Sequence, residues 1–127
     1  MDCAFIETHD PTGGGQMRMR AFHMNGETRE NFNYALRGTP CEIVMGEGFR
    51  YYPARLPELF PIETDFRELG FEAYAGHPLT GAAGSSLGII AVVSRSALDQ
   101  PAFVESVLRI FSVRIVAELE RVAAQDA

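Results

Sequence analysis

The stretch that decides the fold is EAYAGHPLTGAAGSSLGIIAVVS, residues 72–94, in which two apolar runs flank a glycine-rich turn. Residues 81–85 have the length and composition of a β-hairpin loop. Residues 87–94 are apolar at nearly every position, which is typical of a strand covered on both faces. We therefore predict an antiparallel hairpin of residues 72–80 and 87–94, with the second strand inside the sheet.

Three residues within this hairpin restrict how its strands pair. Gly76 and Gly88 indicate bulges or a close approach of neighbouring backbone, because glycine has no side chain to pack. Pro78 has no N–H to donate and is expected where the ladder is interrupted.

Further strands are predicted from alternation and from turn residues. Residues 2–8 form a short apolar run, and residues 16–24 alternate between apolar side chains and arginines, as in a half-exposed strand near the edge of a sheet. The glycines at 13–15 connect the two as a hairpin. Residues 49–52 predict a short aromatic strand that ends before Pro53, whereas residues 27–38 show no clear period and are interpreted as a surface segment.

Helices are predicted from their capping residues. Thr39 fits the N-cap of a brief helix with Pro40 at its first position and Glu42 at the third, and Gly46 and Gly48 end it. Residues 54–70, with two prolines, predict one or two short helical turns.

The longest predicted helix runs from about Gln100 to Ala124, after Asp99 as its cap. One apolar stripe at an average spacing of 3.6 residues is expected to face the sheet: Val104, Leu108, Phe111, Ile115, Leu119 and Val122. A second apolar set falls at the a and d positions of a heptad, completed by Ser106 and Glu120: Phe103, Ile110, Val113, Ala117 and Ala124. The second set is either a seam for a partner helix or a surface covered by the chain's own segments.

Composition excludes several classes of protein. The net charge is −6, and all eleven basic residues are scattered arginines, which argues against a nucleic-acid partner. No apolar run approaches the ~18 residues of a membrane span, and the first residues lack the pattern of a signal peptide. We therefore expect one domain over residues 1–127, in the cytoplasm. Two cysteines are too few for a disulfide framework, so Cys3 and Cys41 are expected to be free thiols.

The segment from Phe32 to Leu119 resembles a GAF domain of bacterial sensor proteins. The resemblance is carried by these blocks in this order: Gly38-Thr39-Pro40-Cys41, Leu59-Phe60-Pro61, Tyr74-Ala75-Gly76-His77-Pro78-Leu79, Gly84-Ser85-Ser86-Leu87-Gly88, Ile110-Phe111 and Ala117-Glu118-Leu119-Glu120-Arg121. It implies an α+β fold with a central antiparallel sheet of five to six strands. The long C-terminal helix then packs on one face of the sheet, and a small pocket lies on the other. The family also has a helix before the first strand, and we expect this chain to lack it.

The same resemblance implies a regulatory module placed upstream of an output domain such as a histidine kinase or a cyclic-dinucleotide enzyme. The ligand and any cofactor stay unknown at this point. Within the family, an enzyme alternative is free methionine sulfoxide reductase, whose chemistry uses three cysteines where this chain has two. A third alternative is a purely structural dimerisation module. The chain shows no motif of a nucleophilic or phosphate-binding enzyme, and we expect no catalytic activity.

Candidate ligand-binding residues gather in the segment that would roof the pocket. Tyrosines combine an apolar ring with a polar tip, and His77 can hydrogen-bond or titrate near neutral pH. Cys41 at a helix start suits a thiolate for redox sensing or metal binding, although the plain packing of a small residue is the favoured interpretation. The candidate set is Cys41, Phe49, Tyr51, Tyr52, Phe60, Phe66, Tyr74 and His77, with core packing as the alternative for each. The histidines and cysteines lack the spacing of a zinc site, so no metal is expected.

The helix seam predicts a homodimer. If Phe103, Ile110, Val113 and Ala117 stayed exposed, the chain would forgo about 1.5–3 kcal/mol for each large side chain that burial could stabilise. A contiguous apolar stripe also favours association, and we expect two-fold symmetry.

Overall fold

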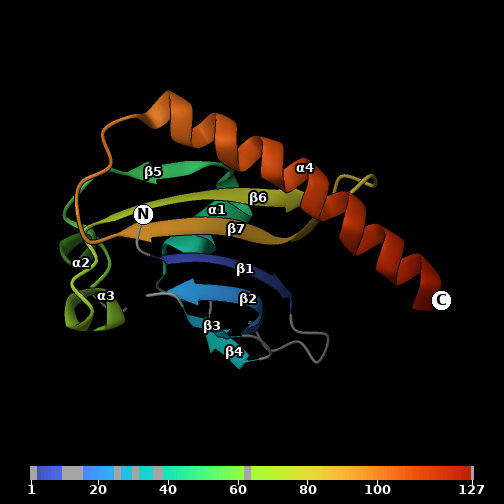
Figure 1. The fold of residues 1–127 in the computed structure, drawn as a ribbon, viewed down its shortest axis with the longest axis horizontal. Coiled ribbons are helices and arrows are strands. Elements are labelled where there is room, and N and C mark those ends of the chain that lie inside the picture. The colour runs from blue at the N-terminus through green and yellow to red at the C-terminus, as the bar shows by residue number, and fades with distance from the viewer. Residues whose placement is uncertain are drawn as a thin grey trace.

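The computed structural model describes residues 3–9, 16–24, 27–29, 32–35, 39–61 and 64–126, and its centre is an antiparallel sheet (Figure 1). Within these residues the sheet has seven strands, in the spatial order β3-β2-β1-β7-β6-β5, and β4 pairs with β2. The strands are β1 (Cys3–His9), β2 (Gln16–Met24), β3 (Glu27–Arg29), β4 (Phe32–Ala35), β5 (Arg50–Tyr52), β6 (Ala73–Thr80) and β7 (Ser86–Ser94). This is the α+β architecture that the sequence predicts.

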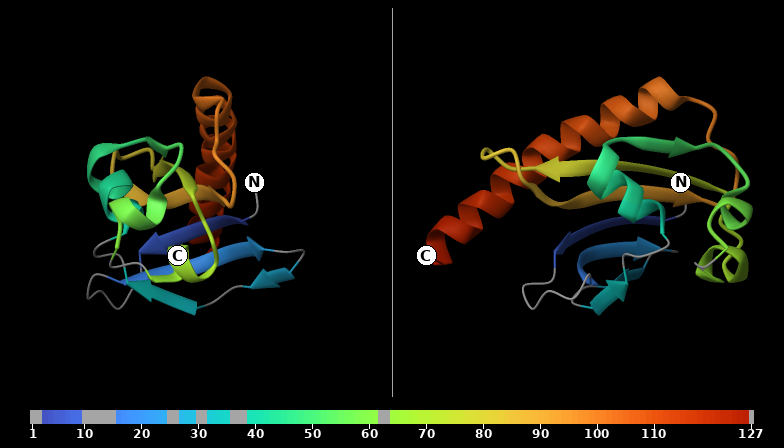
Figure 2. Two further views of the ribbon diagram at one scale, coloured as in Figure 1. Left: turned by 90° about the vertical axis from the view of Figure 1, so that its left-hand side faces the viewer. Right: turned by 180° about the vertical axis from the view of Figure 1, so that it is seen from behind.

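Four helices of the described residues complete the fold: α1 (Pro40–Glu47), α2 (Leu56–Leu59), α3 (Thr64–Glu68) and α4 (Pro101–Asp126). Figure 2 shows α4 on one face of the sheet and α1 on the other, with α2 and α3 at one end. Because α4 contacts β6 and β7 while α1 contacts β5, β6 and β7, the hairpin β6–β7 is sandwiched between the two helices.

The central hairpin is confirmed in position and pairing. β7 lies between β1 and β6, and most of its residues are buried, as expected for a strand covered on both faces. The turn closes with a hydrogen bond from Gly81 N to Ser85 O at 2.9 Å, and Gly84 has a φ of +84°, which favours glycine. The hairpin of β1 and β2 is confirmed as well, and β2 lies next to the short strands at the edge.

Gly88 marks a close approach of two backbones, as the sequence indicates. A Cβ at this position would lie 2.9 Å from Thr8 Cα and closer still to the Glu7 carbonyl oxygen. Only glycine therefore lets β7 pair with β1 in this register. Pro78, by contrast, lies within the paired part of β6, opposite Ile89, and the irregularity in the ladder comes after it, between Leu79 and Thr80.

Residues 27–38 show no clear period in the sequence and are not predicted to form strands, but the structure has two short strands within this segment. β3 and β4 both lie there and both pair with β2. They have three and four residues, too few for alternation to show in the sequence.

The brief helix α1 begins as predicted, although its cap differs in detail, and Gly46 lies within the helix instead of ending it. Thr39 is the N-cap residue and Pro40 begins the helix, but the Thr39 side chain makes no capping hydrogen bond. Gly48, with a φ of +100°, ends the helix.

Two apolar clusters form the core, one on each face of the sheet. The larger lies under α1, α2 and α3 and includes Val44, Leu56 and Tyr74. The smaller lies under α4 and consists of Ala75, Val92, Val104 and Leu108.

The predicted sheet-facing stripe of α4 is only partly right. Val104 and Leu108 are buried, but Phe111 is 55% exposed and Val122 is also exposed. Ser112, one residue after Phe111, faces the sheet instead and donates through Oγ to Arg109 O at 2.7 Å. The expected spacing of 3.6 residues fits either position, and the small side chain is the one that fits against the sheet.

Candidate functional site

A buried polar group lies on the α1 face of the sheet, where the larger core cluster is. It consists of Glu7 on β1, Cys41 on α1 and Tyr74 on β6, and each of these side chains is almost fully buried. The Cys41 Sγ and the Tyr74 hydroxyl are hydrogen-bonded at 3.3 Å. A carboxyl, a thiol and a phenol thus meet under one helix, at a place that is otherwise apolar.

Gly76 makes room for this arrangement. Tyr74 and Gly76 are two residues apart on β6 and therefore point to the same face of the sheet. A Cβ at Gly76 would collide with the Tyr74 ring, coming within 2.9 Å of its Cε1 atom. Because Gly76 has no side chain, the Tyr74 ring lies flat along the strand, and its hydroxyl reaches Cys41.

The Cys41 thiol is held in its protonated form. Burial raises the pKa of the Cys41 thiol well above its ordinary value, and the nearby charge of Glu7 raises the pKa further. The helix start that favours a thiolate is therefore outweighed by desolvation. Cys41 and Cys3 are both buried, and neither is part of a disulfide in the described residues.

We therefore expect Cys41 to react slowly with alkylating agents. In the folded protein at pH 8, iodoacetamide should modify Cys41 at least about tenfold more slowly than a free cysteine, because the thiolate is the reactive species. In denaturant the rate should become ordinary. Time-resolved peptide mass spectrometry checks this, and modification of Cys41 at the unfolded rate under native conditions would contradict it.

Three further aromatic side chains belong to the core cluster on the same face. Tyr52 on β5 lies opposite Tyr74, with ring centroids 6.1 Å apart, and makes an edge-on contact with Phe60 at 5.1 Å. Phe66 on α3 completes the cluster. Five of the eight predicted ligand-binding residues are thus together on the α1 face: Cys41, Tyr52, Phe60, Phe66 and Tyr74.

The other three predicted residues lie on the opposite face, beneath α4. Phe49 and Tyr51 pack against the smaller core cluster, and the Tyr51 hydroxyl donates to Leu98 O. His77 lies near Phe49, with ring centroids 6.3 Å apart, and its Nδ1 donates to Pro78 O at 2.8 Å. The structure therefore divides the predicted set between two faces and brings no single site of eight residues together.

A groove of about 360 Å³ runs between α4 and the β6–β7 hairpin. Its hairpin side is formed by His77, Pro78, Thr80, Gly81 and Ala82, and its helix side by Arg109, Ser112, Val113, Val116 and Glu120. Glu120 also joins the two sides, because its Oε2 accepts a hydrogen bond from Ala82 N at 3.2 Å. We call the five helix residues the groove side of α4.

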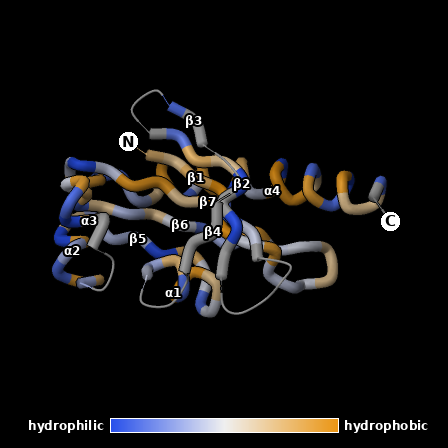
Figure 3. Tube along the Cα trace, turned by 90° about the horizontal axis from the view of Figure 1, so that it is seen from below, coloured by the Kyte–Doolittle hydropathy of each residue, from blue (hydrophilic) through white to orange (hydrophobic). Residues whose placement is uncertain are grey.

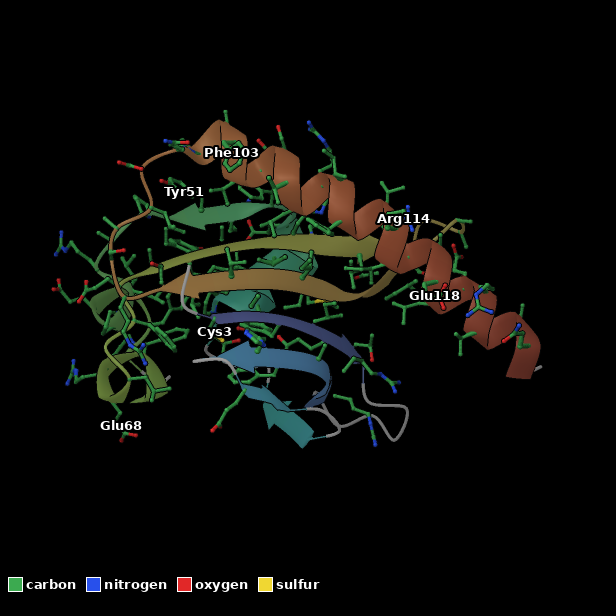
Figure 4. All side chains as sticks on the ribbon, viewed as in Figure 1. Cys3, Tyr51, Glu68, Phe103, Arg114 and Glu118 are labelled. Carbon is green, nitrogen blue, oxygen red and sulfur yellow. The ribbon has the colours of Figure 1, made fainter. Side chains whose placement is uncertain are left out.

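The outer surface of α4 is apolar. Phe103, Ile110 and Val113 are 61%, 65% and 66% exposed, and Ala117 and Ala124 are exposed too. Figure 4 shows Phe103 near the start of α4 and Arg114 and Glu118 further along it. The predicted second seam is thus an open surface in the single chain, and Val113 belongs both to it and to the groove.

The sequence interpretation missed Glu7, although a signal for it existed. Cys3, Phe5 and Glu7 alternate along β1, so they share the face that packs on the core. The run of residues 2–8 predicts only a strand, and that interpretation gives Glu7 no role of its own. An acidic residue at an inward position of a core strand is the pattern that would have identified it.

Two general findings concern metals and membranes. Within the described residues, no cluster of three or more histidine, cysteine, aspartate or glutamate side chains is placed to hold a metal ion. No helix in the described part of the chain combines the length and apolar character of a membrane span.

Comparison with known proteins gives the fold a name. No family model matches the sequence, and no curated protein matches it. Among solved structures, the chain is similar to the GAF domain region of a protein from Geobacter sulfurreducens, with 16% identity and a TM-score of 0.67, covering 94% of this chain and 82% of that one. A domain from Sinorhizobium meliloti, assigned to a two-component sensor histidine kinase, gives 16% identity and a TM-score of 0.66, covering 98% and 82%.

The chromophore-binding domain of Stigmatella aurantiaca phytochrome P1 is similar as well, with 15% identity and a TM-score of 0.65. The match covers 91% of this chain and 47% of the phytochrome domain, so the chain spans about half of that structure. At these identities the comparisons establish the fold. The chain has the GAF fold, as the sequence resemblance implies.

Proposed function

We propose that this chain is a regulatory sensor domain of a signal-transduction protein, which acts by pairing α4 with the α4 of a second copy. The observation that carries the proposal is the apolar outer surface of α4, since the α4 face of the sheet is already covered by Val104 and Leu108. A long helix that keeps a second apolar face suits a contact that forms between chains. The similarity to a domain assigned to a sensor histidine kinase supports a histidine kinase as the output domain in the full-length protein. A cyclic-dinucleotide enzyme is the alternative that the sequence resemblance implies.

The proposed ligand site is the α1 face, around the polar group of Glu7, Cys41 and Tyr74. Ligand sites combine an apolar lining with a few convergent polar groups, and the core cluster on this face also includes Tyr52, Phe60 and Phe66. The buried, protonated Cys41 does not favour the redox-enzyme alternative, which needs reactive thiolates. Thiols of Cys3 and Cys41 that are not in a disulfide fit a reducing cytoplasm, which is part of the proposal.

A matched pair of tyrosine variants tests the ligand site. Native mass spectrometry of protein purified from cells should show a retained small molecule in the wild type. Tyr74→Phe should reduce its retention by up to about tenfold, because a neutral hydrogen bond contributes about 0.5–1.5 kcal/mol. Tyr51→Phe removes the same atom on the opposite face of the sheet and should leave retention unchanged.

The opposite outcomes have distinct meanings. If Tyr51→Phe, and not Tyr74→Phe, reduces retention, the ligand lies on the α4 face. If wild-type protein carries no small molecule, the purely structural dimerisation module is correct, an alternative that the close packing of Cys41 and Tyr74 supports.

A further inference from the structure

We infer that two copies of this chain pair through the outer surface of α4 in an antiparallel orientation, with Arg109 of each copy against Glu120 of the other along the edge that borders the groove. The inference rests on the proposed pairing of α4 and adds its direction and register. It comes from the order of charged and apolar residues along the groove.

The edge of the outer surface that borders the groove has an exposed charged residue at each end. Arg109 lies at one end and Glu120 at the other, with Val113 and Val116 between them. Arg109 and Glu120 are about three helical turns apart, or about 16 Å along the axis. This surface has opposite charges at a fixed separation.

Two copies of such a surface are complementary when the two α4 helices run in opposite directions. A two-fold axis that crosses α4 between Arg114 and Ile115 places Glu120 of the second copy against Arg109 and Val116 of the second copy against Val113. Both charged pairs then form at once, because the separation is the same in each helix. A shift of one turn would break both pairs, so the charges specify the register as well as the direction.

A parallel pair with the helices in register is disfavoured by the same residues. It would bring Arg109 against Arg109 and Glu120 against Glu120 of the second copy, and like charges at facing positions are destabilising. Among the described residues, no carboxylate is within ion-pair distance of the Arg109 guanidinium. Glu120 already accepts from Ala82 N through Oε2, which fixes its side chain beside the groove.

The shape of α4 supports the antiparallel arrangement. The C-terminal part of the helix extends past the sheet, and apolar and polar residues follow one another along it (Figure 3). Residues 121–125 are all exposed. In an antiparallel pair this extension lies along the first half of the other α4, where Phe103 and Ile110 are exposed. Each copy thus covers the apolar surface of the other with a part of α4 that has no sheet beneath it.

Spin labels on α4 measure the direction of pairing. A nitroxide on Ala124→Cys should give an inter-label distance of roughly 30 Å in the antiparallel pair, since residue 124 then faces residue 105 of the other copy. In a parallel pair the same labels would be roughly 10–15 Å apart. A label on Ala117→Cys lies near the two-fold axis and should give a short distance in either pair. Cys3 and Cys41 are buried, and wild-type protein treated with the label controls for their reaction.

Charge reversal tests the register. Arg109→Glu should weaken the dimer about tenfold, because it replaces two attractive contacts with repulsive ones. The double variant Arg109→Glu/Glu120→Arg should restore the affinity of the dimer, because it exchanges the two charges of each facing pair. Glu120→Arg also removes the hydrogen bond from Ala82 N, and this loss cannot by itself strengthen the dimer. A restored affinity therefore shows that the two positions face each other. In a parallel pair, residue 109 faces residue 109 of the other copy. Arg109→Glu would then replace one repulsive pair with another and leave the affinity of the dimer unchanged.

Each outcome decides the inference. A distance of roughly 30 Å at residue 124 with restoration in the double variant supports it. A short distance at both labelled positions, or no restoration, overturns the antiparallel register while leaving the dimer in place. A wild-type monomer overturns both this inference and the proposed pairing of α4.

Discussion

Gly88→Ala is expected to destabilise the fold by about 3 kcal/mol or more, which is a large part of the total for a domain of this size. The added methyl group would overlap the Glu7 carbonyl oxygen and lie 2.9 Å from Thr8 Cα. These atoms belong to the backbone of β1, and a rotamer change cannot move them aside. To accommodate the methyl group, β1 must separate from β7 at the centre of the sheet. Urea unfolding followed by circular dichroism measures the loss.

Gly46→Ala is the matched control for this substitution. Gly46 lies in α1, is exposed, and has no atoms within 4 Å of the position that its Cβ would take. The same change should stabilise the domain by up to about 1 kcal/mol, because alanine favours the helix. If Gly88→Ala unfolds at the same urea concentration as the wild type, the register of β1 against β7 is wrong.

Leu108→Asp is the second substitution with a large expected effect. Leu108 is buried between α4 and the sheet, in the smaller core cluster. The variant loses an apolar side chain and buries a carboxylate, which together should cost about 3 kcal/mol or more. Phe111→Asp, three residues further along the same helix, should change the free energy of unfolding by less than about 1 kcal/mol, since Phe111 is exposed.

This pair of variants also tests which face of α4 meets the sheet. The sequence places Leu108 and Phe111 on one stripe, and the structure separates them. Equal losses of stability in the two variants would favour the sequence interpretation over the structure.

The sheet and its long helix could be predicted from the sequence because their signals are local. The hairpin of β6 and β7 has two apolar runs and a glycine turn, and α1 has Thr39, Pro40 and Gly48 at the positions where helices begin and end. β3 and β4 lacked such signals, because strands of three and four residues are too short for alternation to be visible. They are held by pairing with β2, a long-range contact that no local pattern records.

The candidate site was predicted less well, since aromatic residues were grouped by their place in the chain. Tyr51 and Tyr52 are neighbours on β5 and therefore point to opposite faces of the sheet. Tyr74 and His77 are separated by an odd number of positions on β6 and diverge in the same way. Alternation along the strands could have divided the set. The contact of Cys41 with Tyr74 could not have been predicted, because it joins a helix to a strand 33 positions away.

The oligomeric state of the wild type and of Ile110→Glu tests the central claim that α4 pairs with a second copy. Sedimentation equilibrium at micromolar concentrations should show a dimer for the wild type. In Ile110→Glu it should show a monomer with an unchanged circular dichroism spectrum, because Ile110 faces away from the core. Two isoleucines are lost from the symmetric contact, each contributing about 1.5–3 kcal/mol, so the dimer should weaken by about a hundredfold or more. A monomeric wild type, or a variant that still dimerises as the wild type does, would contradict the account.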